Sequence, residues 1–129
     1  MYKEVIICII IVTVLFIGNT ITEKYTSSSV EELSKQLTEL KEELIKKEKS
    51  NEFIYEKMEQ IENEWQIRHQ KLAYYIEHDE LEKVETDLTL IKSYIEVEES
   101  NDCINKIDEC IFIMEHIEER DKFNLENIF

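Results

Sequence analysis

The chain begins with an uninterrupted run of apolar residues. Residues 5–17 read Val-Ile-Ile-Cys-Ile-Ile-Ile-Val-Thr-Val-Leu-Phe-Ile without a charge, and residues 18–21 extend the run at low polarity. A spanning helix needs about 20 apolar residues to cross a hydrocarbon core about 30 Å thick. We therefore predict a transmembrane helix over residues 5–21, after a short tail over residues 1–4. A cleaved signal peptide is the main alternative, but no small-x-small cleavage site follows the run.

The second pattern is an apolar residue at alternating intervals of four and three positions. It follows a polar joint over residues 22–29. Ser29 and Glu32 have the spacing of an N-terminal capping box, which marks the start of a helix. Of the thirteen positions counted from Leu33, ten are apolar or aromatic, as is typical of a heptad stripe. The pattern predicts one long helix over residues 30–77.

This predicted helix has one weak interval and one candidate interaction stripe. Both stripe positions within residues 46–51 are polar, so the interval is either solvated helix or a hinge. A helix this long cannot be covered along its length by two shorter ones, so we expect part of it to project or self-associate. A homodimer or an envelope protein partner would then bind through the candidate interaction stripe, Leu33, Leu37, Leu40 and Leu44.

Two further helices are predicted within residues 78–129. Asp79 and Glu82 have the spacing of a second capping box, and a polar turn at residues 98–102 separates the two helices. The predicted fold is all-α: a transmembrane helix, then a long heptad-patterned helix and two shorter helices in an antiparallel up-down three-helix bundle. An apolar tail is expected to fold back on the bundle through Phe123, Leu125, Ile128 and Phe129.

The amino-acid composition limits the possible fold classes and binding partners. The chain has one Gly and no Pro, and its 30 acidic and 15 basic residues give a net charge of −15. The scarcity of Gly and Pro disfavours a sheet-rich fold, which needs tight turns. The negative charge excludes nucleic acid as a partner, because nucleic-acid affinity depends on Lys and Arg that neutralise phosphates. Three cysteines are too few for a disulfide framework.

The second half of the chain resembles the domain-of-unknown-function 4363 family. The resemblance is carried by Trp65, the turn Ile76-Glu77-His78-Asp79-Glu80-Leu81-Glu82-Lys83-Val84-Glu85, an apolar third helix and a terminal Asn127-Ile128-Phe129. The resemblance implies a short, singly anchored helical protein of the envelope of Firmicute-type bacteria. It carries over no catalytic residue, because no activity is known for the family. The family-like core positions are Trp65, His78, Leu81, Val84, Leu88 and Ile91.

The histidines offer the most distinct candidate chemistry. His78 stands beside Asp79 and Glu80, which would suit a proton switch or, with His69 and Glu82, a metal site. The ordinary alternative, which we favour, is an exposed histidine in a solvated turn of an acid-rich chain.

Two other groups of residues allow a functional and a structural interpretation. Cys103 and Cys110 lie seven residues apart on an apolar face, where we expect small core side chains, with an intermolecular disulfide as the alternative. Trp65 and the pair Tyr74-Tyr75 are expected to close the end of a bundle rather than to line a ligand groove.

No set of residues supports a catalytic, cofactor or metal site, so we expect a protein that is not an enzyme. The predicted function is a membrane-anchored helical interaction or structural protein of the bacterial cell envelope. A four-residue tail normally stays in the cytoplasm, which places the body outside the cell membrane. The alternative function is an extracytoplasmic ligand- or cation-sensing helical domain.

Overall fold

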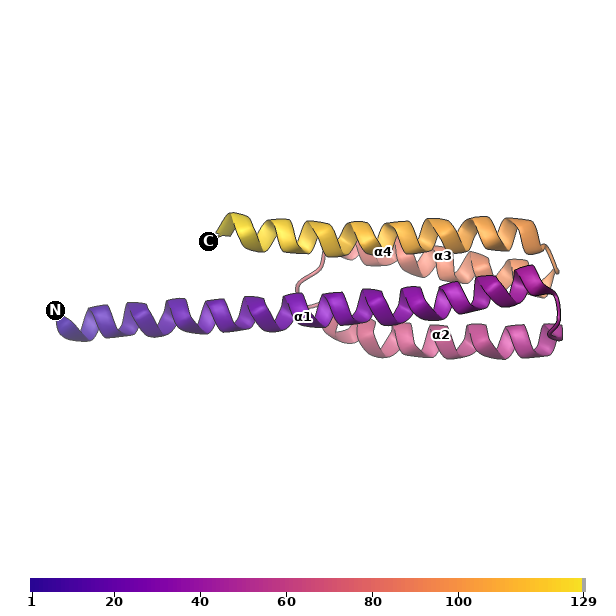
Figure 1. Cartoon of the computed structure of the whole chain (residues 1–129). Coiled ribbons are helices and arrows are strands. Elements are labelled where there is room, and N and C mark those ends of the chain that lie inside the picture. Colours follow the sequence, from indigo (N-terminus) through magenta and orange to yellow (C-terminus); the bar gives the residue numbers. More distant parts are fainter. Residues whose placement is uncertain (129) are drawn as a thin grey trace.

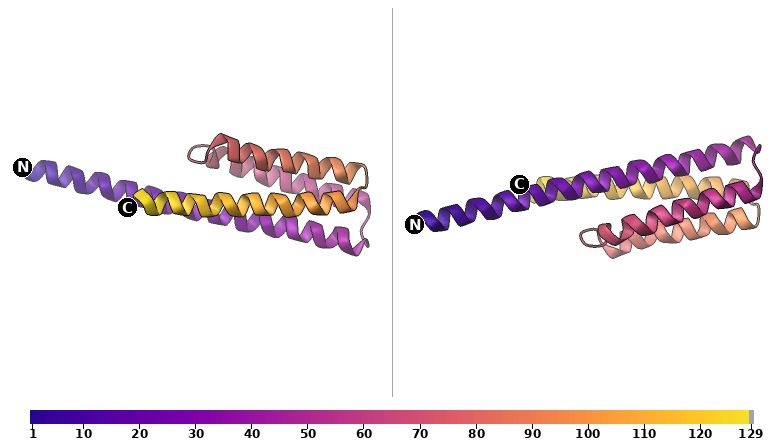
Figure 2. Two further views of the ribbon diagram at one scale, coloured as in Figure 1. Left: turned by 90° about the horizontal axis from the view of Figure 1, so that it is seen from above. Right: turned by 90° about the horizontal axis from the view of Figure 1, so that it is seen from below.

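The computed structural model describes residues 1–128, with the side chains of residues 1–123, and over this range it consists of helices joined by short turns (Figure 1). The helices are α1 (Tyr2–Lys46), α2 (Asn51–Leu72), α3 (His78–Glu96) and α4 (Ser100–Ile128). Helix α1 packs against α2 and α4, and α3 packs against the same two helices. The four helices therefore form an antiparallel four-helix bundle, from which the first part of α1 projects alone (Figures 1 and 2).

One apolar core runs through the centre of this bundle. Every helix contributes buried side chains at intervals of three and four residues, which is the spacing of one helix face. The structure thus confirms the all-α fold. The fully or nearly fully buried members are Leu33, Leu37, Leu40, Met58, Ile61, Trp65, Leu81, Val84, Ile91, Cys103, Ile107, Cys110 and Met114.

The prediction of a single helix over residues 30–77 and of a three-helix bundle is wrong. Helix α1 ends at Lys46, and α2 begins at Asn51, after four intervening residues, and runs in the opposite direction. Lys47 adopts the left-handed conformation (φ 55°, ψ 28°) and donates its backbone N–H to Glu43 O at 3.1 Å. Ser50 then caps α2, since its hydroxyl accepts from Phe53 N–H at 3.2 Å. The weak interval over residues 46–51 therefore contains a hinge, residues 47–50, rather than a solvated helix.

The reversal has a simple energetic reason. A straight helix would leave the apolar stripe of α1 uncovered, whereas the turn brings α2 back against it. The stripes of both helices are then buried in the same molecule, which stabilises the chain by about 25 cal/mol for each Å² of apolar surface removed from water. This gain exceeds the cost of about 1–2 kcal/mol for one residue in the left-handed region.

Replacing Lys47 by Gly is expected to raise the free energy of unfolding by about 0.5–1 kcal/mol, because Gly has no Cβ to strain at positive φ. Thermal unfolding of the full chain in detergent, followed by circular dichroism, measures the change. Lys46→Gly is the matched control: this neighbour is helical, so Gly should destabilise there by about 1 kcal/mol. A loss of stability in both variants would contradict the role given to the left-handed residue.

The predicted polar joint over residues 22–29 is also wrong, because α1 is one unbroken helix. Ser and Thr favour helix ends when their hydroxyls compete for backbone groups. Here the Thr26 hydroxyl instead donates to Thr22 O, four residues back, at 2.9 Å, and the side chain of Thr26 is buried. Ser29 consequently lies inside α1 and caps nothing.

Two predictions about the later helices need correction. Helix α3 starts at His78 after Glu77, with no side-chain cap hydrogen bond, so Asp79 and Glu82 do not form the predicted capping box. The expected fold-back of the C-terminal tail is wrong over the described backbone, because α4 continues as helix to Ile128. Its neighbour α1 supports this extension by running antiparallel to it. Phe129 lies outside the described residues.

Candidate functional site

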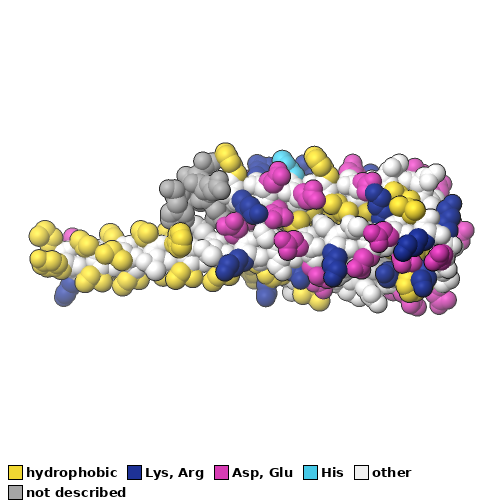
Figure 3. All heavy atoms as spheres, in the orientation of Figure 1, with side chains coloured by type: hydrophobic (Ala, Val, Ile, Leu, Met, Phe, Trp, Pro, Cys, Tyr) yellow, Lys and Arg dark blue, Asp and Glu magenta, His cyan; other side chains and the backbone are white. Residues whose placement is uncertain are grey.

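The hydrophobic segment, residues 5–21, is the first part of the candidate site. From residue 1 to residue 18 every side chain of this projecting helix is exposed. Figure 3 shows it as an apolar rod that leaves a bundle covered with acidic and basic side chains. Within the part of the chain that the structure describes, this is one helix near the N-terminus that is long and apolar enough to cross a membrane.

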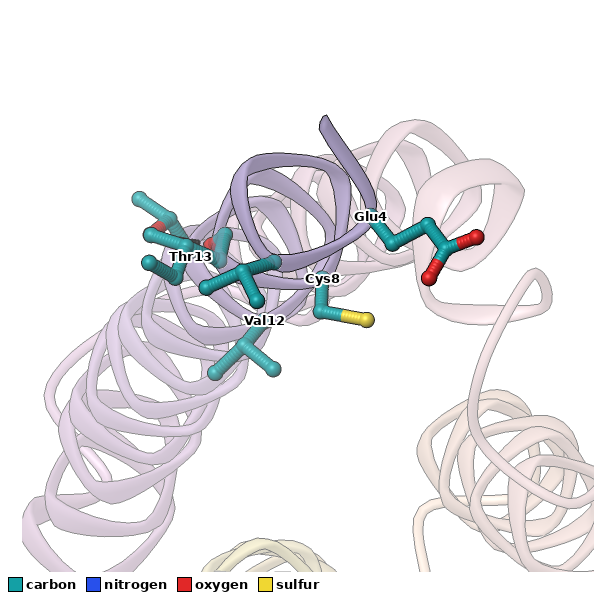
Figure 4. Close-up of a pocket in the computed structure, with 6 residues that line it drawn as sticks. Glu4, Cys8, Val12 and Thr13 are labelled. Carbon is teal, nitrogen blue, oxygen red and sulfur yellow. Dashed lines mark hydrogen bonds between the residues drawn. The ribbon is translucent and has the colours of Figure 1, made fainter. Parts of the chain in front are cut away.

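A shallow hollow at the N-terminal end of α1 is formed by this one helix. Its lining residues, among them Glu4, Cys8, Val12 and Thr13, all belong to α1 (Figure 4). The Thr13 hydroxyl donates to Ile9 O at 2.8 Å, so it is already satisfied within the helix. A ligand pocket encloses its ligand with several elements. This hollow is therefore the outer surface of an apolar helix and not a ligand site.

The second part of the site is a partly buried polar layer at the point where α1 enters the bundle. Tyr75, in the turn between α2 and α3, donates its hydroxyl to Thr22 O at 3.1 Å and lies 2.8 Å from the Thr26 hydroxyl. Arg68 of α2 donates through Nη1 to the Ser29 hydroxyl at 3.0 Å. We call these five residues, Thr22, Thr26, Ser29, Arg68 and Tyr75, the polar layer.

Helix α4 completes the attachment of α1 at this level. The Ser27 hydroxyl donates to Glu118 Oε1 at 3.1 Å, and the half-buried Asp121 carboxyl lies near Thr26. Burial raises the pKa of both Tyr75 and Asp121 above their ordinary values. Tyr75 therefore stays protonated to a higher pH than an exposed tyrosine. The polar layer fixes α1 to its neighbours directly after the hydrophobic segment.

Replacing Tyr75 by Phe is expected to lower the free energy of unfolding by about 1 kcal/mol, because the hydroxyl makes hydrogen bonds in a half-buried position. Urea unfolding of the full chain in detergent measures this loss. Tyr74→Phe is the matched control, since the Tyr74 side chain is exposed and should change stability by less than about 0.5 kcal/mol. Equal effects at both positions would show that the polar layer contributes no specific stability.

The structure does not bring together the histidine cluster that was the less favoured alternative for His78. His78 and Asp79 are exposed, whereas Glu80 is buried and accepts from Arg120 Nη1 at 2.6 Å. His69 instead packs its ring against Trp65, with ring centroids 5.5 Å apart. Among the described residues no group of three or more His, Cys, Asp or Glu side chains could hold a metal ion.

The cysteines of α4 belong to the core. Cys103 and Cys110 are free thiols without solvent exposure, and burial raises their pKa values to about 11 and about 12. Only the thiolate attacks a disulfide or binds a metal. These two residues therefore act as small packing side chains, and a disulfide between two copies would require the bundle to open.

The candidate interaction stripe is not available as a surface. Leu37 and Leu40 have no solvent exposure, Leu33 has almost none, and the partly buried Leu44 packs against the same core. The prediction that this stripe binds a partner is wrong, because α2 and the other helices already cover it. Of the family-like positions, His78 is exposed and the others lie in the core: Trp65, Leu81, Val84, Leu88 and Ile91.

Sequence reasoning missed one buried carboxyl group. Asp87 of α3 is 6% exposed and is hydrogen-bonded to Glu109 of α4. Burial is the main cause that raises the pKa of Asp87 to about 6, and the hydrogen bond and negative charge of Glu109 add to it. A signal was present in the sequence, since Asp87 stands three residues after Val84 and four before Ile91, on the apolar face of α3.

Together the described elements define an all-α protein, with a bundle of helices whose first helix is long and apolar enough to cross a membrane. The family described as Domain of unknown function (DUF4363) matches residues 20–128, and the chain belongs to this family. The matched range begins at the end of the hydrophobic segment and covers the bundle. No curated protein and no solved structure matches the chain.

Proposed function

We propose that the protein is a non-enzymatic, membrane-anchored interaction or structural module of the bacterial cell envelope. One observation carries the proposal: α1 is a single helix that is apolar and exposed over residues 5–17 and buried in the bundle from Thr26 onward. An exposed apolar surface of this size is unfavourable in water and favourable in lipid. The hydrophobic segment then crosses the membrane once and holds the bundle at its surface.

The proposal includes an orientation with the bundle on the extracytoplasmic side. Lys3 lies before the hydrophobic segment, and Lys24 and Lys35 follow it, so the positive charges give little bias and labelling from outside the cell decides the side.

The charged groups of the bundle support a structural role rather than catalysis. Glu80 and Arg120 link α3 to α4 at 2.6 Å, and Lys41 and Asp108 link α1 to α4 at 2.7 Å. Each of these pairs joins two helices instead of converging on a shared cavity. A homodimer or an envelope partner would bind an exposed face of the bundle, since the leucine stripe of α1 is covered.

Cysteine labelling in intact cells tests both insertion and orientation. The native thiols give little background, because Cys8 lies in the hydrophobic segment and the other two are buried. We expect an exposed Thr38→Cys variant to react with a membrane-impermeant maleimide in intact cells, and a Lys3→Cys variant to react only after permeabilisation. The protein should also stay in the membrane after carbonate extraction. Extraction into the soluble fraction would contradict the anchor, and the reverse labelling pattern would contradict the orientation.

Photo-crosslinking tests the interaction role. A photoreactive amino acid at Phe112, which is 70% exposed on α4, should give an adduct of defined mass in cells. The same group at the fully buried Leu37 is the control and should give none. If scanning the exposed faces of all four helices yields only uncrosslinked monomer, the protein has no stable partner and the proposal fails.

The second candidate function, an extracytoplasmic sensing domain, is favoured by one observation. Asp87 and Glu109 line a groove between α3 and α4 together with Asp79 and Glu82. Carboxylates arranged along a groove attract cations weakly. Calorimetry of the full chain in detergent with Ca²⁺ and Mg²⁺ distinguishes the two functions, because the absence of heat at millimolar ion would end the sensing hypothesis.

A further inference from the structure

Helix α4 returns along α1 as far as the hydrophobic segment. Ser27 of α1 is hydrogen-bonded to Glu118 of α4, and Lys41 is paired with Asp108, which sets the antiparallel register of the two helices. Both helices rise by about 1.5 Å per residue, so the backbone of Ile128 lies at about the level of residues 17–21 of α1. Figures 1 and 2 show the same extension of α4 beyond the turn between α2 and α3.

The turn between α2 and α3 reaches nearly the same level. Because Tyr75 contacts Thr22 and Thr26, its neighbour Tyr74 lies at about the level of the first turn of α1 after the hydrophobic segment. A lipid headgroup region extends about 5–8 Å beyond the hydrocarbon core, which is the rise of about three to five helical residues. Tyr74 and the last turns of α4 are thus at headgroup height when the hydrophobic segment spans the bilayer.

Two exposed aromatic side chains mark this end of the bundle. Tyr74 is 89% exposed and Phe123 of α4 is 62% exposed. Among the described residues beyond the hydrophobic segment, Phe112 is the other largely exposed aromatic residue, and it lies in the middle of α4. Aromatic side chains are enriched at the membrane–water interface, where the ring contacts acyl chains and a tyrosine hydroxyl reaches water.

The bundle cannot move away from the membrane by bending at α1. The helix is unbroken between the hydrophobic segment and the core, and the polar layer holds it to α2 and to the turn that carries Tyr74. A flexible joint would let the bundle drift, but a continuous helix fixes its height.

We propose that this end of the bundle, the turn with Tyr74 and the part of α4 with Phe123, rests on the lipid bilayer. Both aromatic side chains lie in the headgroup region of the leaflet from which α1 emerges, and the bundle stands upright on α1 and the end of α4. The partner of this surface is the phospholipid bilayer itself, because the surface continues the hydrophobic segment that enters it. The proposal rests on the proposed membrane anchoring of α1.

Tryptophan fluorescence in vesicles tests the proposal. The chain has one tryptophan, the buried Trp65, so Trp65→Phe gives a silent background into which Tyr74→Trp or Phe123→Trp is introduced. The full-length variants are reconstituted into phosphatidylcholine vesicles that contain lipids with a quencher near the headgroup or near the chain end. Phe112→Trp is the matched control, exposed to a similar degree but remote from the hydrophobic segment.

We expect lipid quenching at positions 74 and 123 that is stronger with the quencher near the headgroup, and iodide quenching about threefold weaker than at position 112. Equal iodide access at all three positions would overturn the proposal. Emission that depends on the protein-to-lipid ratio without lipid quenching would assign the surface to a second copy and would also overturn it. Release of the protein by carbonate would instead refute the membrane anchoring, which separates the two failures.

A second measurement keeps the proposal testable if Trp65→Phe disturbs folding. An environment-sensitive NBD label on Tyr74→Cys or Phe123→Cys needs no change at Trp65, and the native thiols are buried or membrane-embedded. NBD fluorescence at these positions should then be shifted to the blue relative to a label on Phe112→Cys. Identical spectra at the three positions would overturn the proposal.

Discussion

Replacing Leu37 by Ala is expected to lower the free energy of unfolding of the full chain by about 2–5 kcal/mol. The side chain has no solvent exposure and lies in the core cluster shared by the four helices, so truncation loses apolar burial and leaves a cavity. Leu37→Asp should abolish folding of the bundle, because it places a carboxylate in the core without a partner. Urea unfolding in detergent micelles, followed by circular dichroism, gives both results.

Thr38→Ala is the matched control, since Thr38 is the exposed neighbour on the same helix and should change stability by less than about 0.5 kcal/mol. The experiment also separates a core from an interaction stripe. If Leu37→Ala converts a dimer to a folded monomer without loss of stability, measured by analytical ultracentrifugation, the leucines form an interface between two chains and the arrangement of α1 and α2 described here is refuted.

The hydrophobic patterns predicted the helical content but not the reversal between α1 and α2. Four residues separate the two helices, and over this interval the sequence keeps the same spacing of apolar positions on both sides. Periodicity reports which residues share a face, and that face is the same whether the helix continues or turns back. The polar interval over residues 46–51 indicated either a solvated helix or a hinge. It could not decide between them, because the reversal depends on one left-handed residue, Lys47, a lysine where glycine is the usual choice.

The polar layer could not be predicted for a related reason. Thr26 and Ser29 stand in a run of Ser and Thr that is typical of a joint, yet both are buried within a helix. Their hydrogen-bond partners lie far away in the sequence: Tyr75 is 49 residues from Thr26, and Arg68 is 39 residues from Ser29. Local sequence cannot specify such partners, because the register between α1 and α2 is set only when their stripes pack.

Asp87 differs from the residues of the polar layer, because its position on the apolar face of α3 is visible in the sequence. Across the interface on α4 it faces Glu109 and Lys106, and on its own helix Glu82 and Lys83 line the same groove. Lys106 pairs with Glu109 at 2.8 Å, and its charge lowers the pKa of both carboxyl groups. Burial outweighs this effect at Asp87, whose pKa is about 6 against an ordinary value of 3.8. The folded chain therefore binds a proton at Asp87 more tightly than the unfolded chain does.

The raised pKa of Asp87 makes the stability of the bundle depend on pH. Stability from this group is fully present below about pH 4, where Asp87 is protonated in both states, and is lost as the pH rises through 6. Asp87→Asn removes the cost of ionising the buried carboxyl and keeps a donor for Glu109. We expect the substitution to raise the free energy of unfolding by about 1–3 kcal/mol at pH 7.5, with the gain vanishing towards pH 4. Thermal unfolding of the full chain in detergent, at intervals from pH 4 to pH 8, measures this gain in stability.

Asp108→Asn, next to Glu109 but half-exposed and paired with Lys41, is the matched control and should lower stability by less than about 1 kcal/mol. Destabilisation by Asp87→Asn at every pH would show that the buried group is needed as a carboxylate, as a binding site for a cation would require.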